Sequence, residues 1–101
     1  MSKEDVYCLI EIFASHYGLE VFDGTNALLA REVESIADAF VRDSFRGRHG
    51  LFKFAARVVS SLHFHRSIDS VESPRFLPMT ANLRDFVRIY ESERGVSFGF
   101  G

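Results

Sequence analysis

The segment GLFKFAARVVSSLH, residues 50–63, sets the expected architecture because its apolar residues recur at the spacing of a helix. These apolar positions are Leu51, Phe52, Phe54, Ala55, Val58, Val59 and Leu62. At roughly 3.6 residues per turn they cover almost half of the helix circumference, which is more than a surface helix needs. We therefore expect the central helix of the protein to begin at His49 or Gly50 and to end near His63.

Residues 3–17 predict a first helix. Ser2 and Asp5 stand three positions apart at its start, an arrangement in which the hydroxyl and the carboxylate satisfy free amides of the first turn. The apolar residues that follow share one face: Val6, Leu9, Ile10, Phe13 and Tyr17. Gly18 then provides the stop, because glycine favours the left-handed conformation in which many helices end.

Two further helices are predicted on either side of the central one. The second begins at a cap, Thr25 or Asn26, and runs to Ser44. Its stripe consists of Leu29, Val33, Ile36, Ala37 and Phe40. The fourth begins at Thr80 and ends before Gly95. Its inward residues are expected to be Leu83, Phe86, Val87 and Tyr90.

Four amphipathic segments predict an all-α fold, a compact bundle of about four helices. Residues 1–95 form this single domain, and residues 96–101, VSFGFG, form a short C-terminal tail. The tail could pair as an extended strand, fold back on the bundle or stay loose. A mixed α+β fold with strands at 19–22 and 96–100 is the main alternative. Residues 66–79 hold both prolines and are expected to form a loop.

The composition is that of a globular protein. The 101 residues are 47% hydrophobic and 26% charged, which is enough to form a core. Cys8 is the single cysteine, and this excludes an internal disulfide and a cysteine-based metal site. No segment approaches the roughly 20 apolar residues of a membrane span, and the N-terminus has acidic residues where a signal peptide has basic ones. We expect a soluble, cytoplasmic protein.

The sequence lacks the common catalytic motifs. It has no phosphate loop, dinucleotide-binding turn, H-E-x-x-H pair or C-x-x-C pair. Cys8 and His16 stand on one predicted helix, separated by a rise of about 12 Å. A nucleophile and its base need to be within hydrogen-bond reach, so this pair does not form a catalytic dyad. We expect no enzyme activity and no cofactor.

Three histidines and two carboxylates raise the question of a metal site: His49, His63, His65, Asp69 and Glu72. On a helix the imidazoles of His63 and His65 would point about 200° apart. Zinc requires three or four ligands that converge on one point, and nothing in the sequence brings His49 to the other two. We expect no resident metal, and a histidine-based metal or small-molecule sensor is the third function considered.

Charge is distributed unevenly along a chain of net charge −2. Residues 1–40 hold eight acidic residues against Lys3 and Arg31, whereas residues 41–66 hold six basic residues against Asp43. Such an asymmetry indicates either pairing within the monomer or a surface directed at a partner.

The predicted binding residues are the cations of this basic segment and one aromatic residue: Arg46, Arg48, His49, Lys53, Arg57 and Phe64. Arginine and phenylalanine are enriched at interface cores, and arginine binds carboxylates through two hydrogen bonds. We expect a small protein-binding factor, an inhibitor, adaptor or immunity-type regulator, whose partner has an acidic surface. Residues 1–40 of a second copy would offer such a surface in a homodimer. Pairing with Glu20, Asp23 or Glu34 inside the monomer is the competing explanation.

Nucleic acid is the alternative partner. The same cations could contact phosphates, with Phe45 or Phe64 stacking on unpaired bases. However, residues 33–54 depart from a helix-turn-helix at the turn and at two anchor positions. The isoelectric point of about 6.0 also lies below the basic values of dedicated nucleic-acid domains. A nucleic-acid-associated regulator therefore ranks second.

Overall fold

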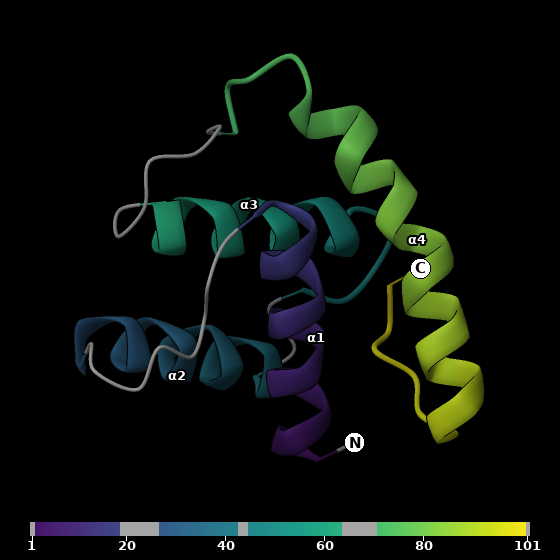
Figure 1. The fold of residues 1–101 in the computed structure, drawn as a ribbon. Helices are drawn as coiled ribbons and strands as arrows, with labels where there is room; N and C mark the ends of the chain where they lie inside the picture. Colours follow the sequence, from purple (N-terminus) through teal and green to yellow (C-terminus); the bar gives the residue numbers. More distant parts are fainter. Residues whose placement is uncertain (1, 19–26, 43–44, 64–70, 101) are drawn as a thin grey trace.

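The computed structural model shows an all-α fold (Figure 1). It describes residues 2–18, 27–42, 45–63 and 71–100. The helices are α1 (Lys3–His16), α2 (Ala27–Val41), α3 (Gly50–His63) and α4 (Phe76–Arg94). Residues 96–100 do not form a strand, because their sheet-like pairing is an isolated bridge between Gly47 and Phe100.

Helices α1 and α3 occupy the centre of the bundle. Each contacts the other three helices, whereas α2 and α4 do not contact each other in the described part of the chain. Figure 1 shows α1 crossing in front of α3, with α2 on one side of α1 and α4 on the other. The Cα radius of gyration is 12.7 Å, as expected for a compact chain of this length. The predicted central position of residues 50–63 is thus confirmed, and α1 shares it.

The predicted capping box starts α1. The Asp5 amide donates to Ser2 Oγ at 3.3 Å, and the Ser2 amide donates to Asp5 Oδ2 at 3.4 Å. The other carboxylate oxygen, Asp5 Oδ1, accepts from Tyr90 Oη at 2.9 Å and from Arg94 at 3.3 Å. Asp5 therefore caps α1 and also attaches it to the C-terminal end of α4. These hydrogen bonds, first that from Tyr90 and then that from Ser2, lower the pKa of the Asp5 carboxyl.

Helix α4 begins earlier than the sequence predicted. It starts at Phe76 rather than at Thr80, which shortens the expected loop. Pro78 is accommodated because the first-turn amides have no intrahelical partner, so its missing N–H costs no helical hydrogen bond. The predicted stop at Gly95 is confirmed, since this residue has φ 66° and its amide donates to the Glu91 carbonyl.

Phe86 is also placed differently from the prediction. It was expected to point inward, but its side chain is 54% exposed. The buried side of α4 is centred on Phe76, Leu83 and Val87. Phe86 is adjacent to Val87 in sequence and is therefore rotated by about 100° from it, to the edge of the buried stripe.

Helix α2 ends at Val41 and not at Ser44. Phe45 is buried and packs on Phe40, with ring centroids 6.0 Å apart. In a continued helix these two residues would point about 140° apart, so the helix must end for Phe45 to enter the core. The predicted caps Thr25 and Asn26 lie outside the described residues.

Phenylalanines form the centre of the core. The ring of Phe54 lies 5.0 Å from Phe13, 5.2 Å from Phe40 and 5.3 Å from Phe45, each in an edge-on arrangement. The C-terminal tail supplies another core ring, since Phe98 is fully buried and lies 5.7 Å from Phe40. Of the three outcomes considered for the tail, the structure shows that it folds back on the bundle.

Two glycines turn the chain into α3. Gly47 has φ 99°, which glycine adopts without steric cost, and its amide donates to the Gly99 carbonyl at 2.9 Å. Gly50 is required for space, because a Cβ there would lie 1.8 Å from the Phe45 carbonyl oxygen. The turn therefore brings the tail against the start of α3.

Candidate functional site

Cations of the predicted binding set lie on an exposed polar face at and before the start of α3. Lys53, Arg57 and Ser60 follow one another at three- or four-residue spacing and are all exposed, and His49 precedes them on the same side. Arg48 is exposed in the turn directly before the helix. The rest of the helix circumference packs into the core, so these side chains are held on a rigid support.

Most of these cations have no counter-charge in the described chain. Arg57 donates to the neutral hydroxyl of Ser35 on α2 at 3.0 Å. Among the described residues, Arg48, His49 and Lys53 have no hydrogen-bonding or ion-pairing partner for their side chains. The positive charge of this face is therefore open to solvent.

Two acidic side chains of α2, Glu34 and Asp38, are engaged by residues of α1. Lys3 pairs with Glu34 and lies 3.0 Å from an Asp38 oxygen, and Tyr7 donates a hydrogen bond to Glu34. The hydrogen bonds from Lys3 and Tyr7 lower the pKa of the Glu34 carboxyl. Glu34, one of the predicted intramolecular partners, is thus used within α1 and α2. The other two, Glu20 and Asp23, lie outside the described residues.

Two residues that the sequence analysis considered for binding, Arg46 and Phe45, are in contact with other parts of the chain. Arg46 is exposed, but its stem lies over the tail, since a Cβ at Gly99 would come within 3.1 Å of Arg46 Cγ. Phe45 is buried, and this excludes it as a base-stacking residue. Phe64 lies outside the described residues.

Helix α4 adds two arginines that the sequence analysis did not single out. Arg84 and Arg88 line a small groove of about 70 Å³, together with Leu51, Val87, Glu91 and Phe100. The groove adjoins the start of α3, because a Cβ at Gly50 would lie 3.0 Å from Phe100. The sequence did indicate that the two arginines share one side of a helix, because they are four residues apart. It did not indicate that they lie near α3, because the position of the tail was not predictable.

The remaining chemistry is sparse. Within the described ranges, no three side chains among His, Cys, Asp and Glu come together as a metal site. His16 Nε2 lies 2.9 Å from the Met79 carbonyl oxygen, so this ring nitrogen makes a structural contact between α1 and α4. The side chain of His63, and residues 65 and 69, lie outside the described part. No described helix combines the length and the apolar character needed to cross a bilayer.

Comparisons with protein-family models, with curated proteins and with solved structures found no match to this chain.

Proposed function

We propose that this protein is a non-enzymatic binding protein that docks on an acidic surface of a partner protein. The contact is made by the exposed cations of the turn before α3 and of its polar face, above all Arg48 and Lys53. The observation that carries the proposal is the unmatched charge of Arg48, in the turn before α3, and of Lys53, on α3, while Glu34 and Asp38 are occupied by Lys3.

The arrangement suits recognition of carboxylates. A cluster of one sign raises the rate of encounter with an oppositely charged surface. Arginine adds specificity because its guanidinium can make two parallel hydrogen bonds to one carboxylate. The helix already fixes the backbone of the cluster, so only side-chain freedom is lost when the partner binds.

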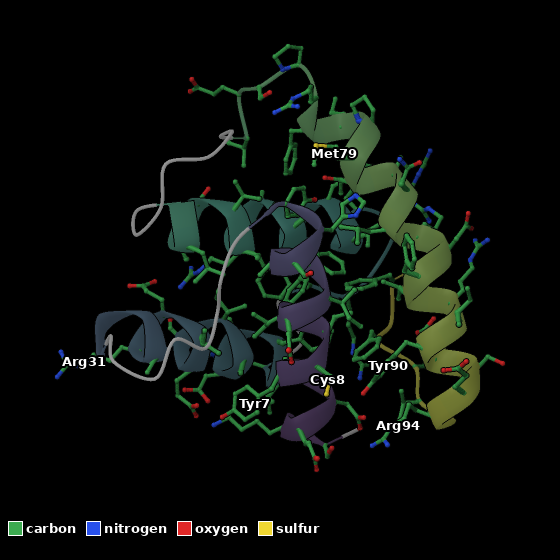
Figure 2. The ribbon with its side chains drawn as sticks, viewed as in Figure 1. Tyr7, Cys8, Arg31, Met79, Tyr90 and Arg94 are labelled. Atoms are coloured by element: carbon green, nitrogen blue, oxygen red, sulfur yellow. The ribbon has the colours of Figure 1, made fainter. Side chains whose placement is uncertain are left out.

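A charge-reversed variant tests the proposal. Wild-type protein, the double variant Arg48→Glu/Lys53→Glu and the control Arg31→Glu would each be immobilised and exposed to nuclease-treated extract of the host. Arg31 is exposed at the outer end of α2 and is not one of the proposed contact residues (Figure 2). We expect wild type and control to retain the same acidic protein, and the double variant to lose it with an unchanged circular dichroism spectrum.

Two results would contradict this function. Retention of the same protein by the double variant would show that the cations do not form the interface, and unfolding of the double variant would show that they serve the fold.

Nucleic acid is tested separately by a mobility shift with mixed oligonucleotides. A shift that weakens steeply with added salt would favour the phosphate-binding alternative, because phosphate contacts release counterions.

A further inference from the structure

A second surface, distinct from the basic face, lies between α1 and α4. It is an open groove of about 560 Å³. Helix α1 contributes Cys8, Glu11, Ile12, Ser15 and His16, and α4 contributes Leu83, Phe86 and Tyr90. Cys8 and Tyr90 lie next to each other where the two helices meet (Figure 2). The walls are thus mainly apolar and aromatic, with polar groups from α1.

The apolar surface extends beyond the groove along α4. Phe86 is 54% exposed, and its ring lies 6.2 Å from that of His16. Ile89, three residues later and therefore on the same side of the helix, is 56% exposed. Scattered exposed apolar residues are ordinary, but residues that continue an open apolar groove mark an interaction surface.

The charges around the groove are negative. Glu11 lines it, and Glu4 stands seven residues earlier on the same side of α1. Glu93 holds the corresponding position on α4, seven residues after Phe86, and all three glutamates are exposed. The cation at this end, Arg94, already binds Asp5. The rim therefore favours an occupant that carries positive charge beside its apolar side chains.

The shape fits a helix. The first and last lining residues of α1, Cys8 and His16, are eight residues apart, which is a rise of about 12 Å along the helix. Two neighbouring helices with an apolar groove between them form the usual receptor for an amphipathic helix. The chain's own basic helix does not provide such an occupant, because the apolar face of α3, including Phe54 and Val58, is fully buried.

We propose that the α1–α4 groove binds an amphipathic helix of a partner protein, one whose apolar face is flanked by lysine or arginine. Its charge preference is opposite to that of the basic face, so the two surfaces bind different kinds of partner and are tested independently.

The first test uses two synthetic peptides with identical leucine faces and one tryptophan each, flanked by lysines in one peptide and by glutamates in the other. The protein contains no tryptophan, so tryptophan emission reports the peptide alone. We expect saturable one-to-one binding of the lysine peptide and binding of the glutamate peptide that is weaker by roughly tenfold or more. Equal binding of the two peptides, or no binding of the lysine peptide, would overturn the proposal.

The second test uses matched variants of α4. Phe86→Ser should weaken lysine-peptide binding roughly tenfold, as loss of an interface anchor does. Leu77→Ser should leave lysine-peptide binding unchanged. Leu77 is 63% exposed on the same helix, but it stands nine residues before Phe86 and therefore on the opposite side of the helix. Ile89→Ser, expected to act like Phe86→Ser, replaces it if that variant fails to fold.

Charge and self-association complete the test. Glu11→Lys should weaken binding of the lysine peptide and strengthen binding of the glutamate peptide. Asp85→Lys, outside the groove lining, should have a smaller effect on the binding of both peptides.

Equal effects of Phe86→Ser and Leu77→Ser would overturn the proposal. Sedimentation that shows a dimer, abolished by Phe86→Ser, would also overturn it, because the occupant would then be a second copy.

Discussion

Replacing Phe98 by alanine tests whether the C-terminal tail belongs to the core. Phe98 is fully buried, and its ring lies 5.7 Å from Phe40 and 5.8 Å from Tyr90. Removing a buried phenylalanine ring costs about 3–5 kcal/mol, since the transfer energy is lost and a cavity remains. A domain of this size has a total stability of about 5–15 kcal/mol, so one tail residue would account for a large part of it. The hydrogen bond from the Phe98 amide to Glu91 Oε2, at 2.8 Å, does not involve the Phe98 side chain and is kept in the variant.

Urea unfolding followed by circular dichroism measures the effect. With a denaturant slope of about 1–2 kcal/mol per molar urea, a loss of about 3–5 kcal/mol lowers the midpoint by roughly 1.5–5 M. Ser97→Ala is the control, because Ser97 is the neighbouring residue and is exposed. A change of less than about 0.5 kcal/mol for Phe98→Ala, the range of ordinary surface substitutions, would refute the packing of the tail.

Three further predictions concern the turn, the α4 stop and the cap of α1. Gly50→Ala should destabilise by about 3 kcal/mol or more in urea unfolding, because its Cβ would meet the Phe45 carbonyl oxygen at 1.8 Å. Gly95→Ala should lower the free energy of unfolding by about 1–2 kcal/mol in the same assay. A Cβ at residue 95 would meet no other atom, so the loss comes only from the backbone strain of a non-glycine residue at φ 66°. The lowered pKa of Asp5, whose ordinary value is 3.8, means that its stabilisation is complete above about pH 5 and is lost as pH falls through the lowered folded value. Asp5→Asn should therefore melt at a lower temperature near neutral pH and show a smaller drop between about pH 5 and pH 3.

The parts of the fold that the sequence predicted depend on local physics. The capping box of Ser2 and Asp5 and the stop at Gly95 involve residues three or four positions apart, and both are present. The central helix was predictable because its apolar face is unusually wide. The start of α4 was not, because Pro78 signals a loop unless it falls in the first turn of a helix.

The surfaces were less predictable because they join distant parts of the chain. The sequence showed the cations of α3, but it did not show that Arg84 and Arg88 of α4 lie near the start of α3. In the structure Phe100 of the tail lines the same groove, and the sequence left the conformation of this tail undecided. Phe86 was assigned to the core from its spacing alone. Spacing gives the direction of a side chain around its own helix, but not how far the neighbouring helix covers it, and α1 leaves Phe86 half exposed.

The contrast between α2 and α3 bears on why the cations are clustered. On α2, Arg31, Glu34 and Asp38 follow one another at helical spacing with both signs present, and Lys3 from α1 pairs with the two acidic residues. On α3, Lys53 and Arg57 have the same sign four residues apart, a pair that destabilises a helix by about 0.2–0.5 kcal/mol. Folding alone would therefore favour replacing Lys53 by a neutral or acidic residue. Among the described residues, Arg57 gains one hydrogen bond, to Ser35, and Lys53 gains no partner. The proposed acidic partner would offset the repulsion between the two cations.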